Sequence, residues 1–232
     1  MKVVYEDNHI IIVYKESGEI VQGDKTGDVP LSETVKDYIK AKYQKPGNVF
    51  LGVVHRLDRP VAGLVLFART SKALPRLNKM FQNKEGEDGV KKTYWAITAK
   101  SASAPKQGTL ENWLVRNEKQ NKSYCYDHEV PNSKHAILDY KIIAEGDRYN
   151  LVEIHLHTGR HHQIRCQLAN IGMTIKGDLK YGSPRSNPDG SISLLSRSME
   201  FTHPVSKQLI SVTAPLPDNR LWKELFQLTI NC

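Results

Sequence analysis

Cysteine is scarce in this chain of 232 residues, and the three that are present, Cys125, Cys166 and Cys232, are an odd number without a pairing pattern. That scarcity argues against a disulfide-rich secreted protein, so we expect free thiols in a reducing compartment. Long apolar runs are also missing. The run from Ile10 to Tyr14 ends at Lys15 and is too short for a signal peptide or a bilayer span. We therefore expect a cytoplasmic protein that is not held at a membrane.

The chain also lacks internal repeats and any Pro/Gly/Ser-rich linker, so we expect one domain over residues 1–232. Hydrophobic residues at 39% and charged residues at 25% are ordinary for a globular protein and argue against disorder. Lys and Arg total 33 against 25 Asp and Glu, a formal net charge of +8. A basic surplus favours polyanionic partners such as nucleic acid, although charge alone is weak evidence.

Hydrophobic periodicity predicts an α+β fold. Strands are expected at 2–5, 9–14, 63–68, 94–99, 108–115, 123–130, 136–145, 151–157, 193–197 and 209–214. Helices are expected at 32–43 with Ser32 as N-cap, at 71–82 with Ser71 as N-cap, at 161–171 before Gly172, and from Asp218 onward. A charged loop is expected at 83–92. This order predicts a mixed, largely antiparallel sheet with flanking helices.

The segment from His55 to Ala68 is the most informative part of the sequence. Charged residues stand directly before an apolar strand, and Pro60 and Gly63 favour a defined turn between them. An aspartate at this place, Asp58, is flanked by two arginines, which would keep it ionised and attract phosphates. Taken alone, the same pattern also fits a loop aspartate that pairs with an arginine for structural reasons.

This segment, His55-Arg56-Leu57-Asp58, then three residues and Gly63-Leu64, resembles the central motif of the RluA-type pseudouridine synthases. Blocks at 92–96, 159–182 and 202–217, and the opening at 5–7, are similar to that family in the same order. Several blocks in order are far more specific than one motif. The resemblance implies the family's catalytic fold. It also implies isomerisation of a uridine in transfer or ribosomal RNA to pseudouridine, without a cofactor or metal.

The resemblance also implies three catalytic residues. Asp58 matches the catalytic carboxylate, acting as a covalent nucleophile or as a stabiliser of positive character at the sugar. Arg165 matches the arginine that pairs with this aspartate and holds it ionised. Tyr94 matches the tyrosine that stacks on the flipped uracil and assists loss of the C5 proton. Without the resemblance, Arg165 fits an exposed helix arginine and Tyr94 a core residue.

Five further residues are expected to bind substrate. Arg56 matches the motif arginine that fills the RNA stack where the base has left. Leu195 is expected as an apolar wall opposite the tyrosine ring, although a strand leucine is usually core. The remaining candidates are His55, Arg59 and Arg160.

The chain departs from the family's pattern in three respects. Val61-Ala62 stands where the family often has two hydroxyl residues, and Lys15-Glu16-Ser17-Gly18 stands where Lys-Pro-x-Gly is usual. Many relatives also carry an RNA-binding module of the S4 type, for which these 232 residues leave no room. RNA recognition is therefore expected from the catalytic domain itself.

Two other functions compete with this interpretation. One is a hydrolytic metal site, since His155, His157, His161, His162 and Cys166 cluster in the sequence. A His-Glu-x-x-His arrangement is missing there, and Arg165 stands one helical turn from His161. The other is an RNA-binding protein that has lost catalysis, which would not need the retained Asp58 and Tyr94. The sequence leaves the target uridine and the oligomeric state open.

Overall fold

The computed structural model describes residues 1–82 and 89–230. The chain forms two compact units, each built from two stretches of sequence. The first unit comprises Met1–Lys91 with Ser196–Pro215, and the second comprises Lys92–Leu195 with Leu216–Cys232. The expected single domain stays a prediction. Most of the loop expected at 83–92 lies outside the described residues, and Lys91 and Lys92 already belong to a strand.

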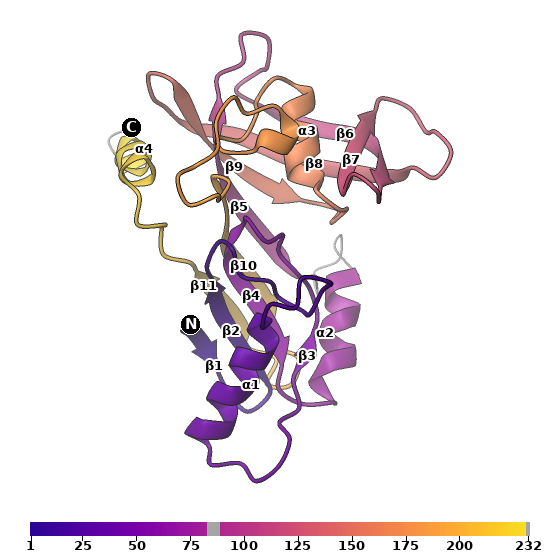
Figure 1. Cartoon of the computed structure of the whole chain (residues 1–232), viewed down its shortest axis with the longest axis vertical. Helices are drawn as coiled ribbons and strands as arrows, with labels where there is room; N and C mark the ends of the chain where they lie inside the picture. The colour runs from indigo at the N-terminus through magenta and orange to yellow at the C-terminus, as the bar shows by residue number, and fades with distance from the viewer. Residues whose placement is uncertain (83–88, 231–232) are drawn as a thin grey trace. The chain divides into compact units, whose positions relative to one another are not determined.

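The first unit is a sheet with two helices beside it (Figure 1). Its strands run in the order β1-β2-β4-β10, with β3 on β4 and β11 on β10. The elements are β1 (Lys2–Glu6), β2 (Ile10–Lys15), α1 (Leu31–Lys42), β3 (Gly52–Val53), β4 (Ala62–Ala68), α2 (Ala73–Gln82), β10 (Leu194–Thr202) and β11 (Leu209–Thr213). The two apolar runs form antiparallel neighbours, β2 and β4, and every residue of both is buried.

Asp7 stabilises the turn between β1 and β2. An Asp7 carboxylate oxygen accepts the backbone N–H groups of His9 at 2.7 Å and Ile10 at 2.9 Å. Such a side-chain acceptor replaces backbone partners that the turn leaves unpaired.

Both predicted helix caps are wrong. Ser32 lies inside α1, whose N-cap is Pro30, and no side chain caps this end. The N–H groups of Leu31 and Ser32 instead donate to the carbonyls of Ile20 and Val21, at 2.8 and 3.2 Å. A preceding segment therefore satisfies the helix start, which no local pattern could reveal. At α2, the hydroxyl of Thr70, not Ser71, accepts the N–H of Ala73 at 3.2 Å.

The second unit is an antiparallel sheet in the order β5-β9-β8-β6-β7. Its elements are β5 (Lys91–Ala99), β6 (Gln107–Asn117), β7 (Lys122–Tyr126), β8 (Lys134–Glu145), β9 (Tyr149–Leu156), α3 (Gln163–Asn170), η1 (Leu179–Tyr181) and α4 (Arg220–Ile230). α3 packs on β6 and β7, and α4 packs on β8 and β9 (Figure 1). A small core joins Leu114, Ala136, Cys166 and Tyr181.

The predicted α+β class with a mixed, mostly antiparallel sheet is confirmed, and each predicted strand and helix is present. The strand expected at 123–130 is shorter, since β7 ends at Tyr126. Two very short elements, β3 and η1, were not predicted because two or three residues carry no periodicity. Over the described residues, no helix is long and apolar enough to cross a membrane.

Candidate active site

The motif segment between β3 and β4 carries Asp58, which is partly buried. The N–H of Val61 donates to the carbonyl of Asp58 at 3.0 Å, so the turn comprises residues 58–61 and lies before the place predicted for it, between Pro60 and Gly63. His55 holds the start of the segment. Its Nε2 accepts the N–H of Leu66 at 3.0 Å, and its ring stacks on Phe81 with centroids 4.7 Å apart. The segment is thereby tied to both β4 and α2.

The residue that sequence reasoning missed in this unit is Lys15, at the end of β2. Its side chain is completely buried, at 0% exposure. The ammonium donates to the backbone carbonyls of Glu16 at 3.0 Å, Arg59 at 3.1 Å and Val61 at 2.7 Å. Burial lowers the pKa of Lys15 to about 8, while the nearby carboxylates of Glu19 and Asp58 act to raise it. The available signal was a lysine that directly closes a fully apolar run.

Two further contacts join the residues after Lys15 to the same turn. The N–H of Gly18 donates to the carbonyl of Arg59 at 2.8 Å, and the hydroxyl of Ser17 donates to the carbonyl of Pro60 at 3.2 Å. The departure from the family's opening therefore still contacts the motif. Each backbone carbonyl from Arg59 to Val61 accepts a hydrogen bond from residues 15–18.

The two motif arginines differ in their surroundings. Arg56 is exposed. The Arg59 guanidinium donates to Asp28 at 2.6 Å and to the hydroxyl of Thr26 at 2.8 Å. The Arg59 side chain is thus engaged with the loop at 24–28, and the expectation that both arginines keep Asp58 ionised stays a prediction.

Gly63 is required because its backbone lies against that of Ser196 in β10. Its φ is +122°, and a Cβ at this position would lie 2.4 Å from the carbonyl oxygen of Ser196 and 2.6 Å from its nitrogen. A side chain would collide with backbone that cannot move aside. The motif glycine thus permits close packing just after the turn that carries Asp58.

Arg165, in α3 of the second unit, is buried, so the alternative of an exposed helix arginine is wrong. Its Nε and Nη2 donate to the two carboxylate oxygens of Asp178, at 2.7 and 2.8 Å. Both side chains are deeply buried, with exposures of 6% and 1%. This bidentate geometry fixes the guanidinium in one orientation. Sequence reasoning did not identify Asp178 as the partner, and the expected pairing with Asp58 stays a prediction.

A second set of hydrogen bonds holds the same guanidinium. Nη1 of Arg165 lies 3.0 Å from Nε2 of His162. Because arginine can only donate, Nε2 must accept, and the imidazole proton is assigned to Nδ1. That nitrogen lies 3.0 Å from the Tyr181 hydroxyl, which also accepts the N–H of Ser123 at 2.8 Å. Burial, reinforced by the charge of Arg165, lowers the pKa of His162 to about 2, so the ring is neutral.

The three remaining predicted residues lie in β5, in β10 and just before α3. Tyr94 is buried in β5 opposite Ile154, with the Lys92 ammonium 5.9 Å from its ring centroid. Leu195 is completely buried in β10. Arg160 is exposed, and its Nε donates to the carbonyl of His135 at 2.8 Å.

The residues of the suspected metal cluster are engaged with different partners. His157 contacts Asp139 at 2.6 Å, and His161 contacts Ser123 at 2.9 Å. In the described ranges, no group of three His, Cys, Asp or Glu side chains is arranged to hold a metal ion. The fold does bring two thiols together without a sequence signal. The sulfurs of Cys125 and Cys166 lie 2.9 Å apart and are not bonded, whereas Cys232 lies outside the described residues.

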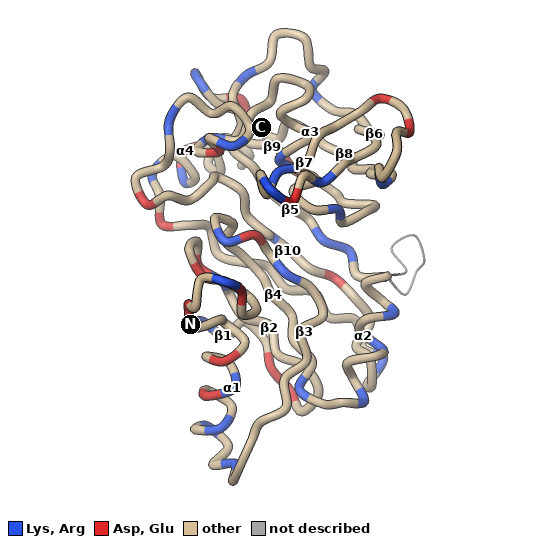
Figure 2. Tube along the Cα trace, turned by 45° about the vertical axis from the view of Figure 1, so that its right-hand side comes forward, with Lys and Arg blue, Asp and Glu red and all other residues tan. Residues whose placement is uncertain are grey.

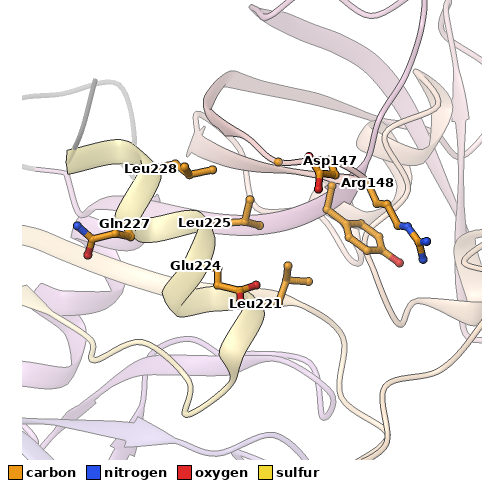
Figure 3. A pocket seen from close by; sticks show the side chains of 9 residues that line it. Asp147, Arg148, Leu221, Glu224, Leu225, Gln227 and Leu228 are labelled. Atoms are coloured by element: carbon orange, nitrogen blue, oxygen red, sulfur yellow. The ribbon is translucent and has the colours of Figure 1, made fainter.

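A surface cavity of about 580 Å³ lies between the β8–β9 turn and α4 (Figure 3). Tyr149, Leu221, Leu225 and Leu228 contribute to its lining. None of the predicted site residues borders it. Basic residues are spread along both units with acidic ones between them, as Figure 2 shows.

Comparisons with known proteins identify the family. The family model described as RNA pseudouridylate synthase matches residues 9–170. Ribosomal large subunit pseudouridine synthase D of Nitrosomonas europaea is 30% identical over 230 residues, covering 94% of this chain and 63% of that protein. tRNA pseudouridine synthase C of Pasteurella multocida is 28% identical over 250 residues, covering 98% and 96% of the two chains.

A solved structure shares the fold. The human protein named RNA Pseudouridylate Synthase Domain Containing 4 matches with a TM-score of 0.78 at 19% identity, covering 99% of this chain and 93% of that one. The family match extends across the motif segment with Asp58 and across α3 with Arg165. The chain belongs to the RluA-type RNA pseudouridine synthase family and is an RNA uridine isomerase.

Proposed function

We propose that this enzyme converts a specific uridine of a structured RNA to pseudouridine with Asp58 as its catalytic carboxylate. The observation that carries the proposal is the support of the turn at 58–61. Each backbone carbonyl from Arg59 to Val61 accepts a hydrogen bond from residues 15–18, and the buried ammonium of Lys15 is one of the donors. A catalytic group must be held within a fraction of an ångström of its reacting geometry, and this turn has that support.

Arg165 and Tyr94 complete the proposed catalytic set. The bidentate pair with Asp178 and the contact with His162 fix the Arg165 guanidinium, so its positive charge is preorganised. Such a charge would keep a partner carboxylate ionised and oriented. Tyr94, buried in β5, would stack on the flipped uracil and assist removal of the C5 proton.

The proposed RNA contacts divide into direct and indirect ones. Arg56 and Arg160 are exposed and would contact RNA directly, Arg56 by filling the place of the flipped base. Leu195 would form the apolar wall of the uracil site. His55 and Arg59 would act through the conformation of the motif segment, since their side chains hold Leu66 and Asp28.

The RNA class is transfer RNA or ribosomal RNA. The relatives' names point to both classes, one to tRNA and one to the large ribosomal subunit. A formal net charge of +8 suits either polyanion. We infer a single functional domain over residues 1–232 and a cytoplasmic location, where both RNA classes are found.

Tritium release from RNA labelled at uridine C5 tests the proposal. Purified wild-type protein and Asp58→Asn are incubated with bulk transfer RNA and with ribosomal RNA transcripts. Asp139→Asn, an aspartate outside the site, is the matched control. We expect release by the wild type and the control, loss of release in Asp58→Asn, and unchanged RNA affinity in all three.

Two outcomes would contradict the proposal. Release that persists in Asp58→Asn would assign the chemistry to another group. Tight RNA binding by the wild type and by Asp58→Asn without release from either pool would favour a binding protein that has lost catalysis.

A further inference from the structure

Two cysteines from distant parts of the sequence meet inside the second unit. Cys125 lies in β7 and Cys166 in α3, 41 positions apart, and their sulfur atoms are 2.9 Å from each other. Packed carbon atoms, which are smaller than sulfur, rest about 3.5–4.0 Å apart. Both thiols are free. Because the sulfurs of a disulfide are about 2.05 Å apart, these two atoms have to approach by about 0.9 Å to become bonded.

The two thiols differ in their access to solvent. Cys166 belongs to the small core that also contains Leu114, Ala136 and Tyr181, and it is 5% exposed. Cys125 packs against that core and is partly buried. A small reagent therefore reaches Cys125 first, and Cys166 reacts with a group that is already attached to Cys125.

The hydrogen bonds of Cys166 direct its sulfur toward Cys125. Its Sγ donates to the carbonyl of Ser123 at 3.2 Å. A thiol has one proton to donate, so in the contact between the two sulfurs Cys125 is assigned as the donor and Cys166 as the acceptor. A lone pair of the Cys166 sulfur thus faces the Cys125 sulfur, which is the atom that it has to attack to form a disulfide.

A metal site is the other use that two neighbouring thiols can have. Within residues 1–82 and 89–230, however, no third His, Cys, Asp or Glu side chain joins Cys125 and Cys166 in a group that could hold a metal ion. Thiol oxidation is the chemistry that this pair supports.

We propose that Cys125 and Cys166 are a reversible modification site, at which a low-molecular-weight disulfide oxidises the two thiols to an intramolecular disulfide. The bond fastens β7, which ends the sheet, to α3. In a reducing compartment such a bond is transient and follows the supply of oxidant. The inference concerns these thiols alone and is independent of the role proposed for Asp58.

The reaction takes two exchange steps, for an oxidant written R–S–S–R. The Cys125 thiol loses its proton to solvent, and the thiolate attacks one sulfur of the oxidant. A bond from Cys125 Sγ to S–R forms, the S–S bond of the oxidant breaks, and R–S⁻ leaves and takes up a proton. The Cys166 thiol then loses its proton, and its thiolate attacks Cys125 Sγ and expels the second R–S⁻, which is protonated in turn. Two protein thiols are oxidised, and the two electrons reduce the oxidant to two thiols.

The first step is slow at neutral pH. The hydrogen bond to Cys166 and burial raise the pKa of the Cys125 thiol above its ordinary value, so little of the attacking thiolate is present. Oxidation is therefore assayed at about pH 8.5.

The test incubates the folded 232-residue chain with oxidised glutathione, blocks the remaining thiols with iodoacetamide and digests the protein with trypsin without reductant. Trypsin places the two cysteines in separate peptides, residues 123–134 and 166–176. We expect these peptides to be joined, with a mass below their sum by two hydrogen atoms, and dithiothreitol to separate them. Because the bond closes a loop of 41 positions in the unfolded chain, we also expect the oxidised protein to melt about 4–16 °C above the reduced one.

Three variants serve as comparisons. Cys232→Ser keeps the pair and removes the third cysteine, so it is the matched control and should behave as wild type. Cys125→Ser should give neither joined peptides nor a rise in melting temperature on oxidation. In Cys166→Ser glutathione should stay attached to Cys125, because the second thiol is missing.

Three outcomes would overturn the inference. They are peptides that stay separate in wild type and in Cys232→Ser, glutathione that remains on Cys125 as the end product in those two proteins, and joined peptides without a higher melting temperature. If Cys125→Ser or Cys166→Ser does not fold, wild type and Cys232→Ser still decide the matter.

Discussion

The buried ion pair between Arg165 and Asp178 makes a quantitative prediction. Both side chains are nearly inaccessible to water, and two hydrogen bonds of 2.7 and 2.8 Å join them. In Asp178→Asn the amide oxygen can still accept one of these bonds, but its NH₂ group faces a guanidinium N–H, donor against donor. The variant therefore leaves a buried positive charge with much less compensation.

Breaking a buried ion pair by removing one partner costs about 3–5 kcal/mol. For a chain of this size, a loss of 1 kcal/mol lowers the melting temperature by about 2–4 °C. We therefore expect Asp178→Asn to melt about 6–20 °C below wild type. Urea unfolding, followed by tryptophan fluorescence, measures the free energy directly.

Asp139→Asn is the matched control, because it makes the same substitution in the same unit. Asp139 contacts His157 at 2.6 Å, but both side chains are more than two-fifths exposed. A pair as exposed as this contributes about 0–1 kcal/mol. If Asp178→Asn loses no more stability than Asp139→Asn, the Arg165–Asp178 pair does not stabilise the second unit and the reasoning fails.

Two further predictions concern backbone strain and acid stability. Gly63→Ala should lower the free energy of unfolding by at least about 3 kcal/mol, because the new Cβ would collide with the Ser196 backbone at a residue with positive φ. A urea titration measures this loss, and a loss below about 1 kcal/mol would contradict the close packing. His162 has its pKa lowered to about 2, so below the ordinary value of 6.5 the unfolded chain binds a proton that the folded chain does not. The contribution of His162 to the free energy of unfolding is therefore complete above pH 6.5. It decreases by at most about 1.4 kcal/mol per pH unit as the pH falls below that value. His162→Asn, which tolerates the left-handed backbone at this position, should remove that part of the acid sensitivity between about pH 6.5 and 4.5, and equal slopes for the two proteins would refute the assignment.

Much of the fold was predictable because local sequence patterns specify it. The buried strands β2 and β4 follow from uninterrupted apolar runs, and α4 follows from its spacing of Trp222 and Leu225. The turn at Asp7 follows from a side chain that accepts hydrogen bonds from the backbone two and three residues further on, whereas Pro60 indicated a turn but not its place at 58–61. In such cases the interacting groups are only a few residues apart, so the sequence itself brings them together.

The starts of the helices were not predictable to the residue. Ser32 has the chemistry of a cap but lies inside α1, because the carbonyls of Ile20 and Val21 accept the N–H groups at that helix start. A local preference of about 1 kcal/mol gives way to hydrogen bonds supplied by another segment.

The same distinction between local and long-range contacts applies to the proposed site. The sequence by itself determined the family, through its motifs, and it determined the residues of the proposed site, with Asp58 before a buried strand and Arg165 on a short helix. Only the tertiary structure decided what holds them. Lys15 meets the carbonyl of Val61 across 46 positions of sequence, and Arg165 meets Asp178 across 13. Whether a polar side chain is buried and paired depends on distances that the folded chain creates, and no spacing along the sequence specifies them.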